Sequence, residues 1–88
     1  MQKYKILFDK KYLKELLKIP KQIQNGIMEK ISELAQNPRP EGSIKLKGSK
    51  KIPLYRVRCG DYRVVYSIQD DILIVIIVDV GHRKDIYL

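Results

Sequence analysis

The stretch LYRVRCGDYRVVY, residues 54–66, consists of two short β-prone segments on either side of the dipeptide Gly60-Asp61, which is a turn signal between strands. If the turn is a two-residue hairpin, Arg58 lies directly opposite Arg63, and Arg56 lies two residues away on the same face. Like charges directly opposite one another destabilise a sheet. The stretch therefore predicts an antiparallel hairpin that holds arginines together against their repulsion, which an anion placed between them would relieve.

The N-terminal half predicts a strand followed by two helices. In residues 4–8 alternate side chains are apolar, which is typical of a strand with one buried face. Asp9 is a typical N-cap for a first helix, Pro20 ends that helix and begins a second, and Asn37-Pro38 stops the second. The expected buried positions are Tyr12, Leu13, Leu16 and Leu17 in the first helix, and Ile23, Ile27, Ile31, Leu34 and Ala35 in the second.

The C-terminal half predicts further strands at residues 62–68 and 72–80, the latter apolar on both faces like a central strand. A turn centred on Asp70-Asp71 would pair Tyr66 with Val75, with the Tyr66 face toward the helices and the arginine face open. We expect an α+β fold, in which a two-helix hairpin packs on one face of a small, mainly antiparallel four-stranded sheet in the order β-α-α-β-β-β.

Length and composition restrict the class of protein. The chain has 88 residues, which predicts a single domain over residues 1–88. One cysteine excludes an internal disulfide. The longest apolar run, Ile72–Val78, is too short to cross a bilayer as a helix, and the N-terminus lacks the pattern of a signal peptide. We expect a cytoplasmic protein without membrane association.

The charge is strongly basic. Eighteen Lys and Arg residues against ten Asp and Glu give a net charge of +8 and a pI near 9.7. The excess gathers in residues 39–63, which include most of a long connection at residues 37–53. Such a concentration favours a polyanionic partner. The alternative is a solvated basic surface that serves solubility.

Three motifs together resemble a known family: KLKG (45–48), YRVRCGDYRVVY (55–66) and VGHRKDIY (80–87). In this order, after a strand and a helical hairpin, they resemble the RelE/ParE toxin superfamily over nearly the whole chain, and its RelE branch most. The resemblance implies a toxin of a type II toxin–antitoxin system that cleaves mRNA in the ribosomal A site. It implies no metal or organic cofactor, and a cognate antitoxin that neutralises the toxin in a hetero-oligomer.

The resemblance also implies site residues. Arg56 and Arg58 stand at the second-strand places where the RelE branch has basic residues, often lysines. Arg63 matches its third-strand arginine, Arg83 the arginine after the last strand, and Tyr87 the tyrosine near the C-terminus. The implied chemistry is attack of a ribose 2′-OH on the adjacent phosphate, with Arg58, Arg63 and Arg83 stabilising the negative charge that develops.

The base that removes the 2′ proton is left open, because arginine keeps its proton and is a poor base. His82 is a candidate acid or base, since its ordinary pKa is near neutrality, and a lysine of residues 45–51 is the alternative. Tyr87 is a candidate for stacking on a base or bonding to phosphate. The residues expected to bind RNA and ribosome backbone are Lys45, Lys47, Lys50, Lys51 and Arg56.

Two other functions share the basic surface and the implied fold. One is non-catalytic inhibition of DNA gyrase, as in ParE-like members of the superfamily. The other is a nucleic-acid-binding module without activity.

Overall fold

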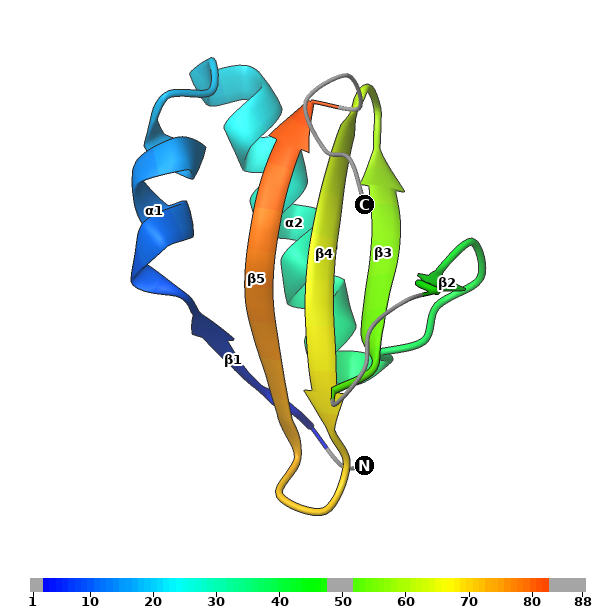
Figure 1. Cartoon of the computed structure of the whole chain (residues 1–88). Helices are drawn as coiled ribbons and strands as arrows, with labels where there is room; N and C mark the ends of the chain where they lie inside the picture. The colour runs from blue at the N-terminus through cyan, green and yellow to red at the C-terminus, as the bar shows by residue number, and fades with distance from the viewer. Residues whose placement is uncertain (1–2, 48–51, 83–88) are drawn as a thin grey trace.

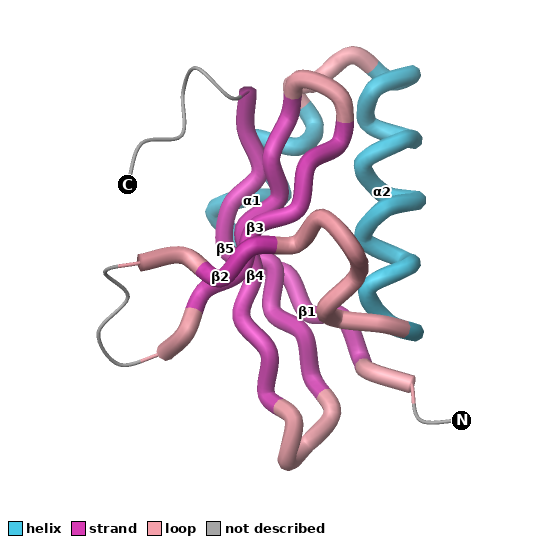
Figure 2. Tube along the Cα trace, turned by 90° about the vertical axis from the view of Figure 1, so that its right-hand side faces the viewer, coloured by secondary structure: helices cyan, strands magenta, loops and turns pink. Residues whose placement is uncertain are grey.

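The computed structural model describes residues 3–47 and 52–82, which form a five-stranded sheet with two helices packed against it (Figure 1). The elements are β1 (Lys5–Phe8), α1 (Lys10–Leu17), α2 (Lys21–Gln36), β2 (Ile44–Lys45), β3 (Leu54–Cys59), β4 (Tyr62–Gln69) and β5 (Ile74–His82). The strands lie in the order β1-β5-β4-β3-β2, with β1 parallel to β5 and the other neighbours antiparallel. α2 covers one face of the sheet, as the turned view shows (Figure 2), and α1 packs mainly against β5.

The predicted α+β fold is confirmed, with one additional strand. β2 lies within the long connection at residues 37–53 and pairs antiparallel with β3, Ile44 opposite Arg56 and Lys45 opposite Tyr55. A two-residue strand carries no periodicity, so the sequence pattern could not reveal it. β2 makes the arginine-bearing β3 an internal strand of the sheet.

The first hairpin has the predicted register. Cys59 pairs with Tyr62 and Arg58 with Arg63, around a turn in which Gly60 has a positive φ of 61°. Glycine adopts this left-handed conformation without the steric cost that a side chain brings. The local turn chemistry therefore fixes how the arginines face one another.

The predicted register of β4 with β5 is wrong by two residues. Tyr66 pairs with Ile77, not with Val75, because the turn takes the four residues 70–73 and places Leu73 at a positive φ of 54°. As a result β5 begins at Ile74 and continues through His82. A shift of two residues keeps each side chain on its predicted face, so the assignment of core residues does not change.

A β-bulge changes the pairing further along β5. Val65 pairs with Asp79 and Tyr66 with Ile77, so Val78 is an extra residue on the β5 side. The bulge changes the alternation of β5, and both Ile77 and Val80 are buried despite their odd spacing. Its consequence for the arginines is that Gly81, not Val78, stands opposite Arg63.

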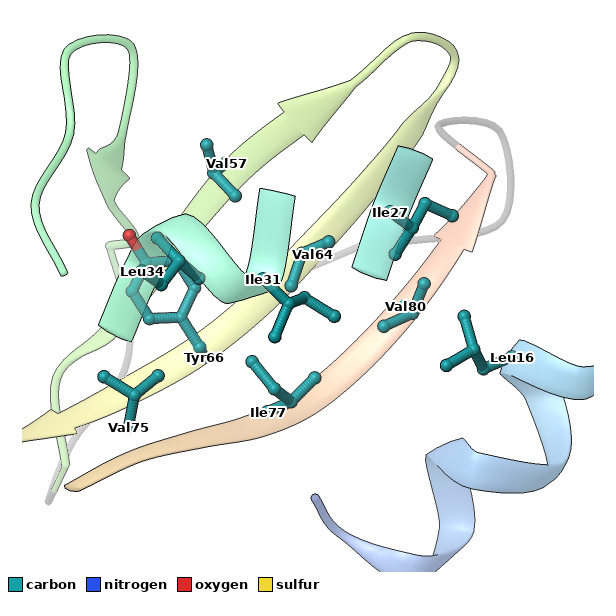
Figure 3. Close-up of a cluster of buried hydrophobic side chains, with 10 residues drawn as sticks. All are labelled: Leu16, Ile27, Ile31, Leu34, Val57, Val64, Tyr66, Val75, Ile77 and Val80. Atoms are coloured by element: carbon teal, nitrogen blue, oxygen red, sulfur yellow. The ribbon is translucent and has the colours of Figure 1, made fainter. Parts of the chain in front are cut away.

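The hydrophobic core lies between the sheet and the helices (Figure 3). Its buried cluster consists of Leu16, Ile27, Ile31, Leu34, Val57, Val64, Tyr66, Val75, Ile77 and Val80. Tyr66 is fully buried, and its hydroxyl donates a hydrogen bond of 2.7 Å to the carbonyl of Pro38. Burial raises the pKa of Tyr66 to about 12. This bond attaches the chain after α2 to the middle of the sheet.

α1 buries less than its sequence predicts. Leu16 is in the core, but Leu13 and Leu17 are 44% and 70% exposed, and Ile23 at the start of α2 is 40% exposed. An eight-residue helix that packs mainly on one strand covers only a narrow stripe of its own surface. The N-cap is as predicted, since Asp9 accepts a 3.0 Å hydrogen bond from the Lys11 N–H. Within the described residues, no helix has the length and apolar character needed to span a membrane.

A polar cluster fixes the segment that leads into β2. The Arg39 guanidinium donates two hydrogen bonds to the Asp70 carboxylate, of 2.8 and 3.2 Å, and the Tyr4 hydroxyl donates a third, of 2.7 Å. Arg39 also stacks over the Tyr55 ring at 5.4 Å. Arg39 and Asp70 are 31 residues apart, so no local pattern predicts their contact. Together they tie the start of the connection to the β4–β5 turn.

Substitution of Asp70 with asparagine is expected to remove an acid-sensitive part of the stability. Hydrogen bonds from Arg39 and then from Tyr4 lower the pKa of Asp70 from 3.8 to about 2. A carboxylate with a lowered pKa stabilises the folded state above its unfolded value and loses that effect as the pH falls through the folded value. Urea unfolding should therefore be measured while the pH is lowered through these two pKa values. The free energy of unfolding should fall less in Asp70→Asn than in the parent. The neighbouring exposed substitution Asp71→Asn is the control, and an equal change in both variants would contradict the assignment.

Candidate functional site

Three arginines share the face of the sheet that α2 leaves open. Arg58 and Arg63 are direct cross-strand partners, and Arg56 precedes Arg58 by two residues on the same strand. Side chains alternate between faces along a strand, so these three point away from Val57 and Val64, which are buried under the helices. Arg58 is exposed, whereas Arg56 and Arg63 are half-buried. We call these three residues the arginine cluster.

The arginine cluster is not satisfied within the described part of the chain. Arg56 and Arg63 each have a buried Nε with no hydrogen-bond partner there, and an unpaired buried donor costs about 1–3 kcal/mol. Burial lowers the pKa of Arg56, and the charges of Arg63 and Arg58 lower it further. Arginine nevertheless keeps its proton at physiological pH. The cluster therefore holds positive charge that is partly desolvated at Arg56 and Arg63, and an anion at its exposed edge would stabilise it.

His82 lies apart from the arginine cluster. It pairs with Tyr62, and the two rings meet edge to face with their centroids 5.4 Å apart. Tyr62 packs against the core on the helix side of the sheet, and His82 lines a small hollow there with Glu15 and Lys18. Because neighbouring residues point to opposite faces, the strand directs His82 to the face opposite Arg63.

The other predicted binding residues are distributed differently. Lys45 and Lys47 are exposed, and Lys45 is on the Tyr55 side of β2, while Ile44 is on the side of Arg56. The structure thus gathers Arg56, Arg58 and Arg63 but not Lys45. The remaining candidates, Lys50, Lys51, Arg83 and Tyr87, lie outside the described residues.

The arrangement is suited to binding and stabilising negative charge. Guanidinium groups present planar pairs of donors that match phosphate oxygens, and here a hairpin and its neighbouring strands hold three of them. Residues 3–47 and 52–82 contain no group of three or more His, Cys, Asp or Glu side chains that would hold a metal ion. The chemistry that these residues support is electrostatic stabilisation of an anionic ligand or transition state.

Comparison with known proteins gives a consistent family. Residues 6–87 match the family model described as ParE toxin of type II toxin-antitoxin system, parDE. A putative RelE-like toxin protein of Escherichia coli is 34% identical over 87 residues, covering 97% of this chain and 90% of its own. The mRNA interferase toxin RelE of Escherichia coli strain K12 is 31% identical over 81 residues, covering 92% and 84%.

A solved structure shows the same fold. The toxin chain in the crystal structure of the archaeal RelE–RelB complex from Pyrococcus horikoshii OT3 superposes with a TM-score of 0.81 at 31% identity. The match covers 98% of this chain and 100% of the other. RelB is the other protein of that complex.

Proposed function

The chain belongs to the RelE/ParE toxin superfamily of type II toxin–antitoxin systems, and on that basis we propose that it is a ribosome-dependent mRNA endonuclease. The observation that carries the proposal is the arginine cluster, whose buried Nε atoms find no partner among the described residues. An RNA phosphate supplies the missing negative charge. A cytoplasmic location follows from a ribosomal target.

The proposed reaction is an internal phosphoryl transfer. The ribose 2′ oxygen attacks the adjacent phosphorus and loses its proton to a base, while the bond from phosphorus to the 5′ oxygen breaks and that oxygen gains a proton. Negative charge grows on the non-bridging oxygens in between. Arg58 and Arg63 stabilise this charge, Arg56 binds the RNA backbone beside them, and Arg83 joins them as the matching residue of the family. No metal or organic cofactor enters the proposed reaction.

His82 is not proposed as the group that transfers the proton, because the strand directs this residue to the other face of the sheet. The proposed candidates are therefore a lysine of residues 45–51 and Tyr87. Lys47, Lys50 and Lys51 additionally bind ribosomal RNA backbone in this proposal.

Substitution of His82 with glutamine is expected to leave the chemical step nearly intact. Loss of a general acid or base slows a reaction by roughly 10²–10⁴-fold, whereas loss of the ring contact with Tyr62 should change the single-turnover rate by less than about threefold. Measurement on programmed ribosomes across pH 5.5–8.5, a range chosen about the ordinary histidine pKa of roughly 6.5, decides between these outcomes. A hundredfold loss together with a missing limb of the pH profile would restore His82 as the catalytic group.

The partner proposed for this toxin is a cognate antitoxin in a hetero-oligomer. Because the net charge is +8, an acidic or amphipathic antitoxin segment complements the arginine cluster and would cover it. Occupation of the same arginines by carboxylates explains how binding of one protein prevents access of RNA.

Mapping of mRNA ends after induction in bacteria tests the proposed function. Codon-phased cuts within translated regions are expected. The match to a ParE-type family model favours inhibition of DNA gyrase as the second candidate. An SOS response with intact messages would therefore replace the first proposal with the second.

A further inference from the structure

α1 and its C-cap residue carry a row of lysines on the side that faces away from the core. Lys10, Lys14 and Lys18 follow one another at four-residue intervals, which places them along one stripe of a helix. Lys14 is two residues before the buried Leu16, so it lies about 200° away from it around the helix axis. All three lysines are exposed. We call these residues the lysine row.

The lysine row is only partly explained by the stability of α1. Like charges four residues apart repel one another. Lys10 and Lys11 also occupy the first turn, where no acidic residue is present and where the helix dipole disfavours positive charge, whereas Lys14 lies in the last turn, where the dipole favours it. Lys18 has Glu15 at 3.6 Å, but no ion pair between described residues involves Lys10 or Lys14. Helix stability therefore does not account for Lys10, where the row begins.

α2 provides an internal comparison. Its exposed charges are of both signs, and Lys30 lies 3.8 Å from Glu33 in an i,i+3 pair. Mixed charges of this kind are what solubility requires. The single-sign row on α1 is therefore not a general property of the surface helices.

The lysine row and the arginine cluster form separate surfaces. α1 packs against β5, whereas Arg56 and Arg58 lie on β3, which is separated from β5 by β4 (Figure 1). A single phosphate cannot contact both. A toxin inserted into a ribosomal site is surrounded by RNA, so that one surface can face the message while the other faces ribosomal RNA.

We propose that the lysine row is a second nucleic-acid contact, which binds the phosphate backbone of ribosomal RNA while the arginine cluster binds the message. The inference rests on the proposed ribosomal target. Lysines at four-residue intervals recur about every 6 Å along the helix axis, and their flexible side chains bind phosphates as point charges without reading sequence. The row contributes affinity and salt dependence but takes no part in the chemical step.

The double substitution Lys10→Gln/Lys14→Gln tests the inference on vacant 70S ribosomes. We expect the dissociation constant to rise roughly tenfold at physiological salt, and the slope of log affinity against log salt to fall by about 1.4–1.8, the value for two lost phosphate contacts. The single-turnover cleavage rate at saturating ribosomes should not change. The melting temperature should stay close to that of the parent, because the repulsion relieved between Lys10 and Lys14 offsets the favourable charge lost from the last turn of α1. Weaker binding then cannot be ascribed to unfolding.

The matched control is Lys3→Gln/Lys5→Gln, which removes the same charge from two exposed lysines outside α1 and should leave both affinity and slope nearly at the parent values. An equal effect in the control would mean that the lysine row acts only through the net charge of the protein, and this result would overturn the inference. Parental ribosome binding in the α1 variant would also overturn it, while leaving the proposed function intact if message cleavage persists. A wild-type chain that neither binds nor cleaves on ribosomes would overturn the proposed function itself.

The competing outcome is that the lysine row binds a protein partner. The exposed Leu13 and Leu17 beside the row distinguish the two cases. An acidic amphipathic protein helix would contact the leucines as well as the lysines, whereas RNA backbone needs the lysines alone. Leu17→Ser should therefore leave ribosome affinity unchanged. Normal ribosome binding of the lysine variant, combined with failure of a co-expressed antitoxin to neutralise it, would assign the row to a protein partner and overturn the inference.

Discussion

Arg63→Ala is expected to reduce single-turnover cleavage on programmed ribosomes by roughly 10²–10³-fold, the effect of removing one donor that stabilises a developing oxyanion. Arg63 stands opposite Arg58, and its Nε is buried without a partner among the described residues. The substitution removes a repulsion and an unsatisfied donor, so the free energy of unfolding should not fall. Activity and stability are therefore expected to separate.

Arg39→Ala is the matched control for this prediction. Arg39 is an arginine with satisfied contacts, two hydrogen bonds to Asp70 and a ring contact with Tyr55. Its loss should lower the melting temperature, while the folded fraction retains most of its cleavage rate. If Arg63→Ala remains fully active at equal expression, the arginine cluster does not stabilise the transition state at this position.

The sequence predicts the arginine cluster because its geometry is local. A two-residue turn at Gly60 and the alternation of side chains are sufficient to place Arg58 opposite Arg63, and the structure has this register. The position of His82 depends instead on a four-residue turn with Leu73 at positive φ and on a bulge at Val78. Neither feature has a sequence signature as strong as an Asn-Gly or Gly-Asp turn, so the pattern alone could not show that His82 lies on the face opposite Arg63.

Contacts between residues that are far apart in the chain likewise could not be predicted from the sequence pattern. Arg39 is one basic residue among many in the connection, and only the folded chain shows that it binds Asp70. The exposed Leu13 and Leu17 show that a local pattern alone does not decide burial. Helical spacing predicts that they share a side of α1, but whether that side is covered depends on where the helix docks.

Arg58→Glu is expected to move stability and activity in opposite directions. A glutamate opposite Arg63 converts a repulsive cross-strand pair into an attractive one, which should stabilise the hairpin by about 0.5–1 kcal/mol. For a domain of this size that corresponds to a rise in melting temperature of about 2–8 °C. Cleavage should fall by roughly 10³-fold or more, because the new carboxylate repels the phosphate and occupies the guanidinium that would bind it.

The exposed substitution Lys3→Glu changes the net charge by the same amount outside the hairpin, and it should leave cleavage within about threefold of the parent, as for a change remote from the chemistry. Thermal unfolding in low and high salt then separates the two effects, since the gain from an exposed ion pair diminishes as salt rises. A destabilised Arg58→Glu would mean that the arginines already avoid one another in the empty protein. A stabilised but inactive variant would show that this hairpin retains its like charges for the phosphate, at the expense of its own stability.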